Sequence, residues 1–194
     1  APAARCREAA EEIGWIEARR DEMLAFWRLV EEGSIPRHVT HNDTKISNFL
    51  FDRQGNVLCV IDLDTVMNST SLNDFGDAIR TYANTGAEDD RDLARVGMSM
   101  EFFTAYTDGY LSQHARELSE AERAYLAFSA RYITYEQVLR FLMDYLDGDT
   151  YYKIRSADHN LVRTRAQYRL LRSMEEQYGA MCEAVRELNA KYIR

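Results

Sequence analysis

The sequence predicts a mainly α-helical domain that carries one small β-hairpin. Apolar residues three or four positions apart recur along most of the 194 residues, and Pro2 and Pro36 are the only prolines. This spacing is typical of helices that bury one face, and the scarcity of proline allows such helices to be long. One pair of short apolar runs, NFLFD and VLCVI on either side of RQGN, has the pattern of a hairpin instead.

The expected helices follow one another along the chain. The first covers about residues 3–32, because its apolar spacing ends at Gly33. After the hairpin, helices are expected over 73–82 (capped by Asn73 or Asp74), 98–112 and 119–147, the last with a capping box formed by Ser119 and Glu122. The C-terminal helix has a regular apolar stripe, which favours core packing and consists of Leu171, Met174, Tyr178, Met181, Val185, Leu188 and Tyr192.

Composition limits the possible partners and the compartment. Hydrophobic residues make up 46% and charged residues 29%, which is typical of one soluble globular domain. The net charge of −8 argues against a nucleic-acid surface. No apolar run approaches the ~18 residues of a membrane span, so no membrane partner is expected. Cys6, Cys59 and Cys182 are odd in number and form no CxxC pair, which favours a reducing cytoplasm.

The segment HNDTKISN, residues 41–48, has the layout of a phosphoryl-transfer site. Asp43 lies five residues before Asn48, and an apolar strand that looks buried then leads to Asp62. Phosphoryl transfer to a hydroxyl requires a carboxylate near that hydroxyl and oxygen ligands that hold Mg²⁺ against the phosphates. Asp43 fits the first role, and Asn48 with Asp62 fits the second. Lys45 is expected to place a cation against the transferring phosphate.

Two nearby aspartate patterns have other interpretations. Asp62-Leu63-Asp64 suggests a calcium loop, but apolar residues follow where an EF-hand needs an oxygen ligand and a glycine. Asp74-Phe75-Gly76 spells the metal-binding triplet of protein kinases, but it follows a polar loop and opens a helix. We therefore assign the metal to Asp62 and expect Asp74 and Asp77 to cap the helix or brace the site. His41 is likewise expected to brace the turn.

Together, HNDTKISN, VIDLD and DFGDAIR resemble the aminoglycoside phosphotransferase and choline kinase superfamily, whose fold is related to that of protein kinases. HND with Lys45, IDLDT and the later DYLDGDTYYKI and HNLVRTRAQ are most similar to bacterial N-acetylhexosamine 1-kinases and their close relatives. The resemblance covers nearly the whole chain. It implies a helical kinase-like lobe with ATP as co-substrate and Mg²⁺ as cofactor. It implies Asp43 as catalytic base, Asn48 and Asp62 as metal ligands, Asp64 as an assisting acid, and Arg80 in the helix behind the site.

The resemblance does not extend to a nucleotide-binding lobe. Members of the superfamily have an N-terminal lobe with a glycine-rich loop, a strand lysine and a partner glutamate. The stretch before His41 is expected to be helical and contains neither GxGxxG nor a Walker A motif. Residues 1–194 are therefore expected to form the C-terminal, catalytic and acceptor-binding lobe. The N-terminal lobe is absent from this chain, either by truncation or by descent from a kinase, and the isolated chain is expected to be inactive.

The acceptor is expected to bind at the polar interruption between the last two long helices, through Asp144, Asp149, Tyr152, His159 and Arg163. These side chains can hydrogen-bond and stack against a sugar, although helix capping explains each of them equally well when taken singly. The leading hypothesis is phosphorylation of a sugar hydroxyl, that at C1 of an N-acetylhexosamine. An aminoglycoside or choline acceptor, and a non-catalytic module that binds sugar or a partner, remain alternatives. The oligomeric state is open.

Overall fold

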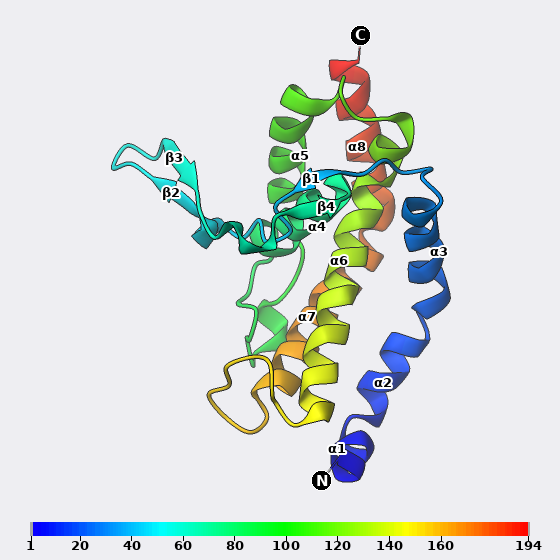
Figure 1. The fold of residues 1–194 in the computed structure, drawn as a ribbon, viewed down its shortest axis with the longest axis vertical. Coiled ribbons are helices and arrows are strands. Elements are labelled where there is room, and N and C mark those ends of the chain that lie inside the picture. Colours follow the sequence, from blue (N-terminus) through cyan, green and yellow to red (C-terminus); the bar gives the residue numbers. More distant parts are fainter. Residues whose placement is uncertain (1, 194) are drawn as a thin grey trace.

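The computed structural model describes residues 2–193, and most of them are helical, which confirms the expected mainly α-helical class. Ala1 and Arg194, the ends of the expected 1–194 lobe, lie outside the described residues. None of the helices within residues 2–193 is both long and apolar enough to cross a membrane. The α-helices (Figure 1) are α1 (Pro2–Glu8), α2 (Ala10–Glu17), α3 (Arg20–Glu31), α4 (Ser71–Tyr82), α5 (Met100–His114), α6 (Glu120–Asp147), α7 (His159–Glu176) and α8 (Tyr178–Tyr192).

Helix α6 forms the axis of this bundle (Figure 1). The predicted capping box starts it, because the Glu122 amide donates to Ser119 Oγ and the Ser119 amide donates to Glu122 Oε2, at 3.1 and 2.8 Å. Gly148 ends it with a φ of 98°, a left-handed conformation that glycine adopts without strain. Helices α4 and α7 pack along α6, and α1, α2 and α8 also contact it. The core between them includes Phe75, Leu126, Leu142, Leu170 and Met174.

Two stretches that were expected to be single helices are divided. The run 3–32 forms α1, α2 and α3, and the C-terminal stripe crosses from α7 to α8. At the second break of the first run, Arg19 has a φ of −111° and its guanidinium pairs with Glu175 of α7 at 2.6 Å. At the break between α7 and α8, the Gln177 side-chain amide donates to the Met98 carbonyl at 2.9 Å. Bonds to distant segments thus stabilise breaks that apolar periodicity does not reveal.

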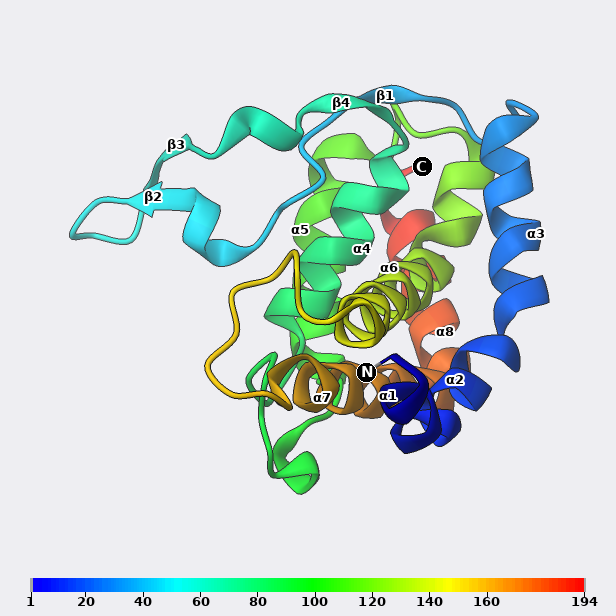
Figure 2. The same ribbon diagram turned by 60° about the horizontal axis from the view of Figure 1, so that its bottom comes forward.

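The expected hairpin is confirmed, but its expected burial was wrong. Strands β2 (Phe49–Phe51) and β3 (Val57–Val60) pair antiparallel, with Leu50 opposite Cys59. In the turn, Asp52 Oδ1 accepts from the amides of Gln54 and Asn56 at 2.9 and 2.8 Å. All of β3 is exposed, because the hairpin projects from the helical bundle (Figures 1 and 2). The apolar character of these strands therefore reflects a face that no described residue covers.

A second, unpredicted ladder anchors the site. Strand β1 (His38–Thr40) pairs antiparallel with β4 (Met67–Ser69), with Val39 opposite Asn68. Each strand is three residues long, too short for an alternating pattern to stand out in the sequence. The ladder brings the residues just before His41 beside the start of α4 (Figure 1). Residues 41–48, the predicted catalytic segment, therefore leave β1 at a fixed position next to α4.

Replacement of Gly76 by Ala is expected to destabilise the fold. A Cβ at this position of α4 would lie 2.5 Å from the Ser129 carbonyl oxygen and 2.7 Å from Ile133 Cγ1, both on α6. Overpacking of this kind costs about 1–3 kcal/mol of unfolding free energy. Chemical denaturation measures the loss. Gly109→Ala in α5 is the control, because nothing lies within 4 Å of its Cβ position. Equal midpoints for the two variants would contradict close packing of α4 on α6.

Candidate active site

Asp74 fixes the start of the catalytic segment. Its Oδ2 accepts from the His41 amide at 2.9 Å and its Oδ1 from the Asn42 amide at 2.6 Å. Asn42 itself has a φ of 61°, the left-handed region that asparagine tolerates better than most residues. Burial raises the pKa of Asp74, and the two amide bonds only partly offset this. With both oxygens on backbone amides, Asp74 has the geometry of a loop brace, the role expected from the sequence.

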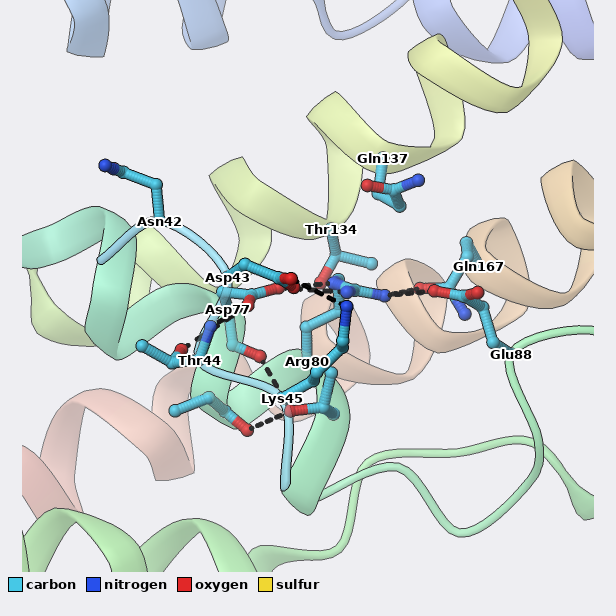
Figure 3. A network of polar contacts seen from close by, with 12 residues as sticks. Asn42, Asp43, Thr44, Lys45, Asp77, Arg80, Glu88, Thr134, Gln137 and Gln167 are labelled. Atoms are coloured by element: carbon cyan, nitrogen blue, oxygen red, sulfur yellow. Dashed lines mark hydrogen bonds and ion pairs between the residues drawn. The ribbon is translucent and has the colours of Figure 1, made fainter. Parts of the chain in front are cut away.

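Asp77 and Arg80 form the second support, beneath the segment (Figure 3). Asp77 Oδ2 accepts from the Thr44 amide at 2.8 Å, and Asp77 Oδ1 lies 2.9 Å from Arg80 Nη2. Arg80 Nη1 also donates to Glu88 Oε1 at 2.8 Å and to Gln167 Oε1 at 3.3 Å. Burial alone would lower the pKa of Arg80, but Asp77 and Glu88 raise it above its usual value. The guanidinium therefore stays charged and ties the loop to α4 and α7.

The hairpin returns to the catalytic segment at Ile61. The Ile61 amide donates to the Asn48 carbonyl at 2.9 Å, and the Ile61 carbonyl lies 3.1 Å from His41 Nε2. Thr65 Oγ1 donates to the His41 carbonyl at 2.6 Å. His41 thus contacts both ends of the turn that contains Asp62, as expected of a brace. The backbone bond at Ile61 brings Asp62 next to Asn48, although the two are fourteen residues apart in the sequence.

Asp43 lies at the centre of the predicted catalytic group (Figure 3). Its Oδ2 accepts from Lys45 Nζ at 2.6 Å and from Asn48 Nδ2 at 2.8 Å, and its carbonyl accepts from the same amide at 2.8 Å. Burial acts to lower the pKa of Lys45, but the hydrogen bond to Asp43 and the charges of Asp43, Asp62 and Asp77 raise it. Lys45 is therefore a firmly charged cation beside the carboxylate. Asp43 Oδ1 has no hydrogen bond to any residue within 2–193 and can accept one from a ligand.

Asp62 presents an uncommitted carboxylate beside this group. It is exposed, its φ of 62° and ψ of 58° are left-handed, and its side chain has no hydrogen bond or ion pair among the described residues. Left-handed non-glycine residues are strained and tend to occur at functional positions. Asp64 follows in a 3₁₀ turn over Leu63–Thr65 and is also exposed. Asp64 therefore lies near Asp62 in the chain, but it is not held toward Asp43 by any hydrogen bond.

These groups suit Mg²⁺ better than a metal that needs a full set of protein ligands. No cluster of three or more His, Cys, Asp or Glu side chains with metal-site geometry occurs within residues 2–193. Magnesium prefers one or two carboxylates, with phosphate oxygens and water completing its octahedron. The Asp62 carboxylate and the Asn48 amide oxygen, which accepts no hydrogen bond from the described residues, are among the uncommitted oxygens that could hold it.

Two of the predicted acceptor residues instead organise the loop between α6 and α7. Asp144 accepts from the backbone amides of residues 150–152 at 2.8, 2.8 and 3.0 Å and from Asn160 Nδ2 at 2.8 Å. Burial raises the pKa of Asp144, but these bonds more than offset it and lower the pKa overall. Asp149 pairs with Arg5 of α1 at 2.7 Å and also accepts from Asn160. Both carboxylates are occupied by the protein, which is the capping geometry.

The other three predicted acceptor residues, Tyr152, His159 and Arg163, lie around the same loop. His159 is buried, and its Nε2 lies 2.9 Å from Asp89 Oδ2. The Arg163 guanidinium lies over the Phe141 ring at 5.3 Å. The Tyr152 ring packs on the same phenylalanine at 4.8 Å and borders a cavity of about 340 Å³. The structure thus brings all five predicted residues together around this loop. Tyr152 and Asp144 border the cavity, but the Asp144 carboxylate is already occupied by protein donors.

Sequence reasoning missed a set of polar residues closer to Asp43. A small cleft opens between the catalytic segment with α4 on one side and α6 on the other, and Asn73, Glu136, Gln137 and Arg140 line it. Figure 3 shows Gln137 on the face of α6 that looks toward Asp43 and Asp77. The one signal in the sequence is the polar group at 136, 137 and 140, one turn apart in a helix rich in apolar residues.

Comparison with known protein families agrees with this geometry. The model of the phosphotransferase enzyme family matches residues 2–125, well over half of the chain. The matched stretch contains the catalytic segment, the hairpin with Asp62, and the bracing helix α4. The chain therefore belongs to the phosphotransferase enzyme family.

Proposed function

We propose that this chain is the catalytic and acceptor-binding lobe of an ATP- and Mg²⁺-dependent kinase that phosphorylates a sugar hydroxyl. The main support is the cluster of Asp43, Lys45 and Asn48. The backbone bond between Ile61 and Asn48 holds the next residue, Asp62, near this cluster. Family membership supports phosphoryl transfer to a hydroxyl. The C1 hydroxyl of an N-acetylhexosamine is the proposed acceptor, on the resemblance of the catalytic and C-terminal segments to N-acetylhexosamine 1-kinases.

Each side chain has a definite task in this reaction. Asp43 accepts a hydrogen bond from the acceptor hydroxyl and takes its proton as the new O–P bond forms and the bond to the ADP oxygen breaks. Lys45, charged and 2.6 Å from Asp43, offsets the negative charge of the transferring group. Asn48 holds the Asp43 carboxylate in place through its amide group. Asn48 and Asp62 would hold a Mg²⁺ ion, which would supply charge neutralisation on the phosphates when bound.

The exposed hairpin supports a separate nucleotide-binding lobe. Within residues 2–193, eighteen large hydrophobic residues are exposed, and eleven of them lie from Val39 to Met67, with Leu58 64% and Leu63 61% exposed. Exposed apolar residues concentrated in one part of a chain suggest an interaction site. We propose that a nucleotide-binding lobe outside these 194 residues packs on this face and contacts the ATP phosphates. The isolated chain should then bind ATP weakly, and a tight ATP complex by calorimetry would contradict the proposal.

The function is tested with the protein expressed from its whole natural reading frame. It is incubated with ATP, Mg²⁺ and N-acetylglucosamine, N-acetylgalactosamine, kanamycin or choline, and the products are analysed by mass spectrometry and NMR. We expect phosphate on C1 of an N-acetylhexosamine. Transfer only to kanamycin or choline would overturn the sugar proposal but keep the kinase. Sugar binding with no transfer to any acceptor would favour the non-catalytic module.

A further inference from the structure

The small cleft beside the catalytic segment has two walls of different origin. Asn42, Asn73 and Asp77 form one wall, and Glu136, Gln137 and Arg140 of α6 form the other. Its volume is about 70 Å³. Asn42 directly precedes Asp43, and Asp77 binds the Thr44 amide at 2.8 Å. The cleft therefore borders the segment that carries Asp43, the residue that is proposed to receive the acceptor hydroxyl.

Three side chains of this cleft, those of Glu136, Asn73 and Gln137, carry an oxygen that accepts no hydrogen bond from residues 2–193. The Glu136 carboxylate forms no hydrogen bond or ion pair with any residue of the described stretch 2–193, whereas both oxygens of Asp77 are engaged. The Asn73 side chain donates to Ser69 Oγ at 2.9 Å, but its own oxygen is buried without a partner. Burial raises the pKa of Glu136, against the opposing charge of Arg140. A donor that enters the cleft can therefore pair with Glu136, which is half-buried, without displacing a protein partner.

The shape and chemistry of the cleft define what can enter it. A volume of about 70 Å³ admits one substituent rather than a whole sugar ring. Glu136, Asn73 and Gln137 favour a substituent with O–H or N–H donors. Arg140, whose guanidinium has no hydrogen bond or ion pair within residues 2–193, adds a donor on the same wall as Glu136. A hydroxyl or a primary ammonium group carries such donors. The trimethylammonium head of choline has no N–H and would leave these oxygens unpaired.

We propose that this cleft is the acceptor subsite, in which Glu136 binds a hydrogen-bond-donating substituent of the acceptor while Asp43 receives the hydroxyl to be phosphorylated. The inference rests on the proposed kinase function and extends it. It makes Glu136 a determinant of acceptor specificity and excludes a choline-type acceptor. Hydroxyl and ammonium donors share the same recognition chemistry, and two substitutions at Glu136 distinguish them.

The test uses the full-length protein with N-acetylglucosamine, kanamycin and choline as probes. Glu136→Ala should raise the KM of the true acceptor about tenfold or more, because a hydrogen bond to a charged group is lost, and should leave the KM for ATP unchanged. Glu136→Gln retains an oxygen acceptor but no charge. A hydroxyl ligand should therefore keep most of its affinity in this variant, whereas an ammonium ligand should lose nearly as much as with Ala.

Glu187→Gln is the matched control, because Glu187 is exposed on α8 and lines none of the cavities described here. Binding of the same probes is also measured by calorimetry without ATP, so that the subsite is tested even if the protein transfers no phosphate. Absence of all transfer would defeat the proposed function alone. Unchanged acceptor KM and unchanged probe affinity in Glu136→Ala, or tight choline binding that depends on Glu136, would overturn the subsite.

Discussion

Replacement of Asp43 by Asn is expected to lower kcat by about 10²–10⁴-fold, the usual contribution of a positioned general base. The amide has nearly the same shape as the carboxylate but cannot take the acceptor proton. It also removes the negative partner that Lys45 contacts at 2.6 Å. The fold should persist, because this pair is partly exposed and such pairs contribute about 0–1 kcal/mol. Steady-state kinetics of the full-length protein measure the effect.

Asp108→Asn is the matched control for this substitution. Asp108 of α5 contacts Lys191 Nζ at 2.7 Å, so it forms an aspartate–lysine pair of similar length outside the catalytic segment. Its kcat should equal that of the wild type. If Asp43→Asn and Asp108→Asn had the same turnover, Asp43 would not be the base. A rise in KM for the acceptor without a change in kcat would point to a binding role only.

Asp62→Asn and Asp74→Asn are expected to change different properties. The first should lower turnover, and the second should lower the stability of the fold. Asparagine tolerates the left-handed backbone of Asp62, so the change removes the charge without new strain. We expect kcat to fall by orders of magnitude and the Mg²⁺ requirement to rise, because carboxylates are the principal protein ligands of magnesium. In Asp74→Asn one of the two oxygens that bind the His41 and Asn42 amides becomes an NH₂ group. Unfolding free energy should fall by about 1–3 kcal/mol, the penalty of an unsatisfied buried group.

The two variants control for each other when turnover, Mg²⁺ dependence and denaturation midpoint are measured for both. The literal Asp74-Phe75-Gly76 triplet makes this comparison necessary. Near-normal turnover in Asp62→Asn, together with lost turnover and an unchanged denaturation midpoint in Asp74→Asn, would contradict our assignment. Asp74 rather than Asp62 would then be the metal ligand. The geometry argues against this result, because both Asp74 oxygens bind amides and Asp62 is free.

Local patterns predicted the elements that depend on residues close together in the chain. The capping box of Ser119 and Glu122 and the left-handed Gly148 set the ends of α6 where the sequence indicated them. The Gly-containing turn and its flanking apolar runs predicted β2 and β3. These features were predictable because capping, turn geometry and apolar periodicity act over a few residues.

Contacts between distant segments were beyond such patterns. The β1–β4 ladder joins residues about thirty positions apart through backbone hydrogen bonds. Because such bonds form with almost any side chains, the sequence carries little sign of the pairing. Burial was likewise misjudged for β3, because the apolar strand itself does not tell whether another layer covers it. Asp144 was a plausible ligand in the sequence, yet the fold surrounds it with three backbone amides.

By itself, the sequence determined the helical class, the hairpin and the order Asp43, Asn48, Asp62 that indicates phosphoryl transfer. Only the tertiary structure decided which aspartate braces and which stays free, and that Glu136 and Asn73 face a cleft beside the catalytic segment. The physical reason is that a carboxylate's role depends on the donors around it. Those donors come from α4, α6 and the loops, which meet only when the chain folds.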